Sequence, residues 1–350
     1  MEPVTIQDIA DKLGFSKSTV SRALKDHPDI SDKTKKAVQD LANALDYQPN
    51  TLALNLRQKR SNTIGIIVPE LVHYFFSTVI SGVEDIAHSM GYNVIITQSN
   101  ESNEREKTNT QALYSSRVDG LLVSVASNTD NIHHLESLYQ KGVPIVFYDR
   151  ASENLEVSKV LIDDFKGGFI ATEHLIEQGC KRIAHLLGPP NLLISQQRAL
   201  GYKAALQKYN LPIIEELIVP CQGATIEDGI IPTRENLLKF AELPDAIFAS
   251  NDITAIGAMK AVQRAGLKIP EDIAIIGFSD WQLAAFTEPS LSSISQSGFR
   301  IGQRAAELLF NEIQAPEGKR PAPRTEVLTP KLVVRNSSRK LKINDDDASN

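Results

Sequence analysis

The chain has 350 residues, of which 42% are hydrophobic, 23% charged and 6% aromatic. This composition is typical of a globular protein with two or three domains, and it excludes disordered and fibrous classes. No apolar run is long enough for a membrane span and the acidic start does not resemble a signal peptide, so we expect a cytoplasmic protein. The two cysteines, Cys180 and Cys221, are too few for a disulfide framework or a zinc site, and we interpret both as core residues.

The net charge of −6 argues against a nucleic-acid partner only if the charge is evenly spread. It is not: residues 1–60 contain ten basic and eight acidic side chains, whereas the remainder contains 27 basic and 35 acidic ones. The acidity therefore belongs to the larger part of the chain, and the first 60 residues remain open to binding DNA.

The first 48 residues predict a small domain of three helices. Thr5 begins the first helix, with Asp8 completing a capping box, and Gly14 ends it. Ser16 caps a second helix that runs to about Leu24, and a third follows a serine cap at position 31. The polar outward face of the second helix consists of Lys17, Ser18, Ser21 and Arg22.

Two helices joined by a tight glycine turn, the second with a polar and basic outer face, fit a helix-turn-helix that inserts its second helix in the DNA major groove. Any small helical bundle with a solvated face has the same spacing, so the spacing alone leaves both interpretations open.

The motifs of this region are more specific than its spacing. They are T-I-x-D-I-A at Thr5–Ala10, S-x-x-T-V-S-R at Ser16–Arg22, I-S-x-K-T at Ile30–Thr34, L-x-Y-x-P-N at Leu45–Asn50 and A-x-x-L-R at Ala53–Arg57. Together they resemble the start of the lac repressor family of bacterial transcription regulators. The resemblance implies that residues 1–48 form a DNA-binding headpiece.

The resemblance also implies individual roles. Lys17, Ser18 and Arg22 would face base edges, and the planar fork of Arg22 matches the O6 and N7 atoms of guanine. The positions that the family uses mainly for phosphate contacts and docking are Thr5, Ser16, Thr19, Ser21, Thr34, Tyr47 and Asn50.

Residues 49–61 resemble the hinge helix of the family. So short a segment is not stably helical alone in water, so we expect it to order when it packs on its symmetry mate and on DNA. Ala53 and Leu56 would then contact DNA, and Leu56 occupies the position of a wedge that enters the minor groove. An ordinary core leucine is the alternative for Leu56.

From residue 62 onward, short apolar runs alternate with amphipathic helices. The runs are 63–69, 92–98, 119–125, 144–149, 182–188, 245–250 and 273–279. This alternation predicts α/β structure with parallel sheets covered on both faces, and so many strands predict two lobes. In such folds ligands bind at the carboxyl ends of the strands, so we expect a site between the lobes.

The same family resemblance extends over this region, through V-D-G-L-L at Val118–Leu122, R-x-x-G-Y at Arg198–Tyr202, A-x-N-D at Ala249–Asp252 and D-I-A-I-I-G-F at Asp272–Phe278. It implies a periplasmic-binding-protein-like effector and dimerisation domain over 62–338, whose two lobes are joined by three crossings. The expected lobes are 62–161 with 295–320, and 162–294 with 321–338. A polar tail, 339–350, lacks the leucine heptads of a tetramerising segment.

Carried over residue by residue, the family's effector pocket would be lined by Tyr74, Phe75, Ser124, Asp149, Gln196, Arg198, Asn251, Ser279 and Gln296. The carboxylate of Asp149, the guanidinium of Arg198 and the amide of Asn251 suit a polyhydroxylated ligand. An arginine also suits a carboxylate or a phosphate. The structural alternatives are that Arg198 anchors its helix and that Asp252 is a helix cap.

The sequence departs from the family where a strand ends in Gly277-Phe278-Ser279-Asp280, because the family commonly has a carboxylate at the position of Ser279. No counterpart of the family's stacking aromatic is found near residues 222–225. The identity of the effector therefore stays open.

The phosphate-loop, nucleophile-elbow and zinc-protease motifs are all missing from the sequence, so we expect no enzyme, no cofactor and no metal. The adjacent His133 and His134 are interpreted as solvated. A secreted sugar-binding protein would leave the first 60 residues unexplained. We expect a homodimeric, effector-responsive regulator that binds operator DNA, most plausibly a repressor of carbohydrate metabolism. An activator, or a regulator that needs a protein co-regulator, is the alternative.

Overall fold

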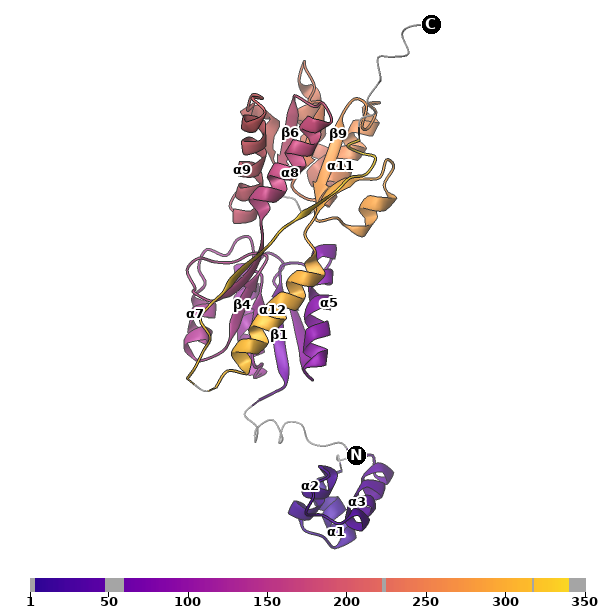
Figure 1. Cartoon of the computed structure of the whole chain (residues 1–350), viewed down its shortest axis with the longest axis vertical. Coiled ribbons are helices and arrows are strands. Elements are labelled where there is room, and N and C mark those ends of the chain that lie inside the picture. The colour runs from indigo at the N-terminus through magenta and orange to yellow at the C-terminus, as the bar shows by residue number, and fades with distance from the viewer. Residues whose placement is uncertain (1–3, 48–59, 222–224, 317, 340–350) are drawn as a thin grey trace. The chain divides into compact units, whose positions relative to one another are not determined.

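The computed structural model describes residues 4–47, 60–221, 225–316 and 318–339. The chain forms two compact units, Met1–Asn62 and Thr63–Asn350 (Figure 1). The expected hinge helix, with Asn50, Ala53 and Leu56, lies outside the described residues, as does nearly all of the polar tail. No helix of the described part is both long and apolar enough to span a membrane.

The first unit contains the three predicted helices, α1 (Ile6–Leu13), α2 (Lys17–Leu24) and α3 (Asp32–Ala44). The capping box is confirmed, because the Thr5 backbone N–H donates to Asp8 Oδ2 (2.7 Å) while Thr5 Oγ1 accepts from the Asp8 backbone N–H. Gly14 ends α1 with a φ of 66°, which a side chain disfavours. The buried core of the unit consists of Ile9, Ala10, Val20, Ala23, Val38 and Ala42.

The second unit begins with a lobe built on a six-stranded sheet of order β11-β5-β4-β3-β1-β2. All its strand pairs are parallel, as predicted. The strands are β1 (Thr63–Val68), β2 (Asn93–Gln98), β3 (Leu121–Val123), β4 (Ile145–Tyr148), β5 (Ser158–Ile162) and β11 (Thr325–Leu328).

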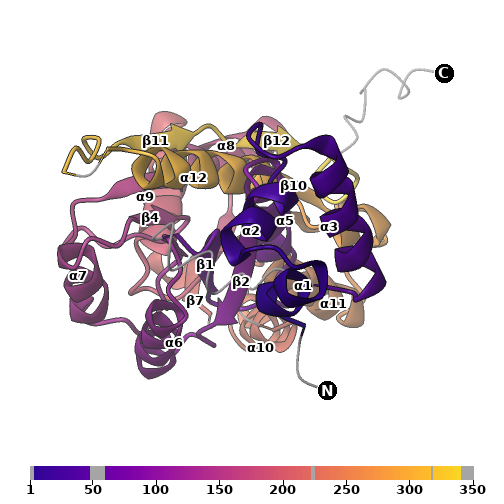
Figure 2. The ribbon, with the colours of Figure 1, turned by 90° about the horizontal axis from the view of Figure 1, so that it is seen from below.

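Helices cover both faces of this sheet because its central strands are apolar on both sides. Ile66 of β1 packs toward α5 (Tyr74–Ser89) and α12 (Gly298–Ile313). Ile67, the next residue, packs toward α6 (Asn103–Ser115) and α7 (His133–Gln140). Figure 2 shows α5 and α12 on one side of β1 and β4, and α6 and α7 on the other.

The other lobe has a second six-stranded sheet, of order β12-β10-β9-β8-β6-β7, in which the β10–β12 pair alone is antiparallel. Helices α8 and α9 cover one face, whereas α10 and α11 cover the other. The elements are β6 (Ile183–Leu187), β7 (Ile218–Pro220), β8 (Ala246–Ala249), β9 (Ala274–Phe278), β10 (Ser292–Ser295), β12 (Lys331–Val333), α8 (Asp164–Glu177), α9 (Leu193–Lys208), α10 (Glu227–Glu235) and α11 (Asp252–Arg264).

The chain crosses between the lobes after β5, after β10 and after β11 (Figure 1). One expected boundary is wrong: we assigned 321–338 to the second lobe, but residues 325–328 form β11, which pairs with β5 in the first lobe. The reason is that the chain leaving α12 extends the first sheet by one edge strand before it crosses. The crossing then lies between Leu328 and Lys331, and β12 completes the second sheet.

Candidate DNA-reading face and effector cavity

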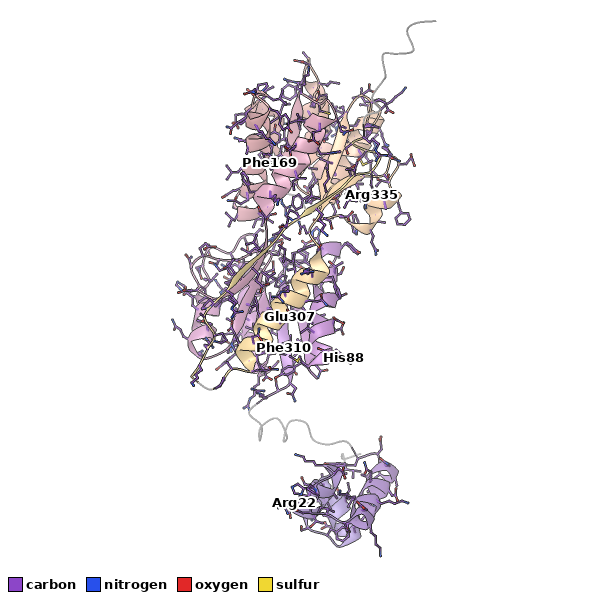
Figure 3. All side chains as sticks on the ribbon, viewed as in Figure 1. Arg22, His88, Phe169, Glu307, Phe310 and Arg335 are labelled. Atoms are coloured by element: carbon purple, nitrogen blue, oxygen red, sulfur yellow. The ribbon has the colours of Figure 1, made fainter. Side chains whose placement is uncertain are left out.

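The polar outer face of α2 is presented to solvent. Lys17, Ser18 and Arg22 are exposed, and Figure 3 shows Arg22 at the periphery of the three-helix unit. Within the described part of the chain, the side chains of Lys17 and Arg22 make no hydrogen bond and no ion pair. Both cations are therefore available to an external partner without breaking an internal contact.

The hydroxyl groups around this face have local duties. Ser16 Oγ accepts from the Thr19 backbone N–H (3.1 Å) and lies 2.8 Å from Thr19 Oγ1, so it fixes the first turn of α2. Thr34 is engaged by the cap of α3, and burial raises the pKa of the half-buried Tyr47. Ser21 is half-buried on the flank of α2. These residues shape the reading face.

A cavity of about 510 Å³ lies at the carboxyl ends of strands from both sheets of the second unit. Six of the nine expected effector residues line it: Phe75, Asp149, Arg198, Asn251, Ser279 and Gln296. They come from α5, from the ends of β4, β9 and β10, from α9 and from the residue before α11. The two lobes thus both contribute side chains to one cavity.

Arg198 is buried in this cavity by a dense set of partners. Its Nε donates to Asp164 Oδ1 (2.8 Å) and its NH1 to the Ser250 carbonyl oxygen (2.6 Å). Its guanidinium carbon lies 3.7 Å from the centroid of the Phe278 ring. Arg198 therefore anchors its helix and lines the cavity at the same time.

Asp149 is 9% exposed, and no hydrogen bond to its carboxylate is found among the described residues. Burial raises its pKa from 3.8 to about 6, against the opposing effect of Arg150, whose Nε lies 3.9 Å away. The backbone of Asp149 is left-handed, with a φ of 60°, directly after β4. A strained, buried and unshared carboxylate is typical of a ligand site.

Three more buried polar atoms around the cavity have no hydrogen-bond partner: Arg150 Nε, Ser250 Oγ and Gln296 Oε1. Leaving such atoms unpaired is costly, and a bound polar ligand removes that cost. The cavity thus offers a carboxylate, an amide oxygen, a hydroxyl and a guanidinium N–H to one ligand.

Comparison with known proteins identifies the family. Residues 5–50 match the lacI family of bacterial regulatory proteins, and residues 172–338 match the periplasmic binding protein-like domain. The chain is 32% identical to the HTH-type transcriptional repressor PurR of Vibrio campbellii, over 96% of this chain and 99% of that protein. It is also 32% identical to the repressor CytR of Escherichia coli K12, over 96% of this chain and 97% of that one.

The chain belongs to the lacI family of bacterial regulatory proteins. It is a DNA-binding transcription regulator with an effector-binding domain.

Solved structures agree with this lacI-family assignment. The lac repressor dimer bound to operator and the anti-inducer ONPF matches with a TM-score of 0.84 at 26% identity, over 97% of this chain and 100% of that one. The complex of the regulator CelR with cellobiose matches with a TM-score of 0.72 at 28% identity, over 95% and 99% of the two chains. A lacI-family regulator from Enterococcus faecium with bound ribose has a TM-score of 0.68 at 32% identity, over 80% and 100%.

Three expected effector residues of this lacI-family regulator do not line the cavity. Tyr74 lines a small adjoining pocket of about 40 Å³ beside Trp281. Ser124 is fully buried after β3. Gln196 is exposed and donates to the Pro190 carbonyl oxygen (2.9 Å), because it lies on a different face of α9 from Arg198.

Charged residues that the sequence analysis missed also line the cavity. Glu101 accepts from Arg150 NH1 (2.8 Å) and from the Ser127 backbone N–H (2.6 Å), and the pKa of Glu101 is lowered because these contacts outweigh the effect of burial. Glu70 pairs with His73 (3.2 Å), whose pKa burial lowers. Glu70, Glu101 and Arg150 each follow a strand of the first sheet, so the carboxyl-end rule applied to every strand would have found them.

The departure at Ser279 has a structural explanation. Asp280, the next residue, accepts from Arg335 NH2 (2.7 Å) and does not line the cavity, whereas Ser279 does. Asn251 caps α11, its Oδ1 accepting from the Thr254 backbone N–H (2.8 Å). Asp252 is not that cap: it is buried, accepts from the Trp281 backbone N–H and from Ser293 Oγ, and burial raises its pKa to about 6.

One further expectation is wrong: His134 is not solvated. Its side chain is 10% exposed and its Nε2 lies 3.0 Å from Oε1 of the fully buried Glu106. Glu106 Oε2 also accepts from the Ala126 backbone N–H (2.7 Å). The pair therefore holds the loop after β3, which supplies Ser127 and Asn128 to the cavity.

Proposed function

We propose that this regulator binds a pseudo-palindromic operator as a homodimer and that an uncharged, polyhydroxylated effector in the cavity changes its operator affinity. Lys17, Ser18 and Arg22 read base edges in each half-site. The regulated genes serve carbohydrate metabolism, and the protein acts in the cytoplasm. The observation that carries the proposal is the cavity with its unpaired polar atoms, in the same chain as the exposed polar face of α2.

The charges of the cavity favour an uncharged effector over an anionic one. Both arginines are already paired, Arg198 with Asp164 and Arg150 with Glu101, at 2.7 and 2.8 Å. The unshared carboxylate of Asp149 repels an anion and accepts hydrogen bonds from sugar hydroxyls. The bound cellobiose and ribose of two structural neighbours support this class of ligand.

The way in which the effector acts follows from the position of the cavity. A ligand that touches Asp149 and Arg198 contacts both lobes, which are joined by three crossings. The effector needs only a different affinity for two arrangements of the lobes in order to shift their populations. The lobe movement alters the pairing of the headpieces and thereby the operator affinity.

The test is a thermal-shift screen of the purified protein against sugars, sugar acids and phosphosugars, followed by operator titrations. A sugar at about a hundred times its Kd stabilises by about 2.7 kcal/mol, a shift of several degrees. We expect that sugar to change operator affinity in a fluorescence anisotropy titration. A shift with acids or phosphosugars alone, or no change in operator affinity, contradicts the proposal.

We expect Arg22→Ala to weaken operator binding by about 1 to 3 kcal/mol and to relax specificity at one base pair in each half-site, because a bidentate contact to guanine is lost. The measurement compares the operator, single-base variants of it and random DNA. Equal weakening on all three sequences contradicts a base-reading role and leaves Arg22 as a phosphate contact.

A further inference from the structure

A second cavity, of about 400 Å³, adjoins the effector cavity on the side of the crossing segments. We call it the crossing-side compartment. It lies between the loops after β3 and β4, the start of α8, the start of α9 and Val327 of β11. Six residues line both cavities: Ser127, Asp149, Arg150, Asn191, Leu192 and Ile194. The two spaces are therefore neighbouring parts of one cleft.

The crossing-side compartment is rich in apolar surface. Phe165 of α8, Leu193 of α9 and Val327 of β11 line it while being 42%, 50% and 54% exposed. Large apolar side chains left in solvent around one concave site are typical of a place where an apolar group binds. They come from both lobes, so an occupant touches both.

The polar side chains of this compartment already have partners. Asp130 Oδ1 accepts from Asn103 Nδ2 (2.6 Å), Asp163 Oδ1 accepts from the Lys166 backbone N–H (2.9 Å), and Asp164 is paired with Arg198. The effector cavity differs, because Ser250 Oγ and Gln296 Oε1 are buried there without partners. The two compartments therefore recognise different chemistry, the first a hydroxylated group and the second an apolar one.

We propose that the crossing-side compartment binds an uncharged apolar ring that is a substituent of the effector. The inference rests on the proposed function and narrows its ligand class to a hydroxylated ring that carries an aromatic or alkyl group, as an aryl glycoside does. Asp149 lines both spaces, so its carboxylate lies at the junction of the two rings. The apolar ring packs against Phe165, Leu193 and Val327, which draws the two lobes together.

The test uses N-phenyl-1-naphthylamine, an uncharged fluorophore that becomes bright in apolar sites, with the full-length protein. We expect one probe per chain to bind the wild type. The double variant Phe165→Ser with Leu193→Asn should weaken binding about tenfold or more, because two apolar contacts are lost. Val327→Arg, at an exposed position, should fill the opening and block binding without disturbing the fold.

The matched controls are Leu200→Asn, which is 51% exposed on the same helix as Leu193, and Phe299→Ser, which is 45% exposed on α12. Neither lines a cavity of the cleft, so both should bind the probe as the wild type does. No binding by the wild type, or equal loss in variants and controls, overturns the inference.

A separate arm asks whether the apolar group belongs to the effector. We expect 4-nitrophenyl glycosides to displace the probe and the parent sugars not to displace it. Binding of the probe that no glycoside reverses contradicts a shared ligand. Because the operator titrations do not use the probe, a failure of the proposed function is distinguishable from a failure of this inference.

Discussion

Replacing Arg198 by alanine is expected to lower the free energy of unfolding by about 3 to 5 kcal/mol, because one member of a buried ion pair is removed. Asp164, its partner, is 8% exposed and is left without its cation. The Ser250 carbonyl oxygen loses a donor at 2.6 Å, and the Phe278 ring loses the guanidinium stacked over it. The measurement is denaturation by urea, monitored by circular dichroism.

A matched control lies on the same helix. Lys203 pairs with the exposed Glu215 at 2.8 Å, and Lys203→Ala should cost less than about 1 kcal/mol because water screens the pair. Adding Asp164→Asn to Arg198→Ala should recover part of the loss, since the unpaired charge is then removed. A loss below about 1 kcal/mol for Arg198→Ala contradicts the anchoring role.

Asp149→Asn is expected to stabilise the protein by about 3 kcal/mol at pH 7, because burial raises the pKa of Asp149 from 3.8 to about 6. The folded state holds this proton more tightly than the unfolded chain does. The charge therefore destabilises the fold fully above about pH 6, and the effect disappears as the pH falls to about 4. The gain in the variant should follow the same course.

The measurement is the free energy of unfolding of wild type and variant from pH 4 to pH 8. Asp252, whose pKa burial also raises to about 6, is present in both proteins and cancels in the difference. Glu156→Gln, at an exposed carboxyl, is the control and should show no such difference. A pH-independent gain contradicts the charge argument. Asp149→Asn should also weaken sugar binding about tenfold, since a charged acceptor is lost.

Much of the fold is predictable because local rules act strongly in this chain. Thr5, Gly14, Ser16 and Ser31 set the helix ends of the first unit through short-range hydrogen bonds and backbone freedom. Runs of buried β-branched residues likewise predict the central strands. The edge strands were harder to recognise: β11 and β12 are short and partly exposed, so they lack an apolar run, and their place depends on pairing with distant strands.

The site was predictable where backbone position decides it and unpredictable where side-chain partners do. Asp149 and Ser279 line the cavity because each directly follows a strand. Gln196 does not, because helix rotation turns it to solvent. That Arg150 and Arg198 are neutralised by Glu101 and Asp164 depends on contacts between residues 34 to 49 positions apart, which no local pattern specifies.

The three crossings also constrain how the protein can be made. The first lobe needs α12 and β11 for its core and its sheet edge, and the second needs β12, which ends at Val333. A chain emerging from the ribosome therefore exposes two unfinished sheets until its last segment is released, although the three-helix headpiece, complete within 47 residues, is free to fold at once. Truncation before β11 should yield insoluble protein that still contains a folded headpiece.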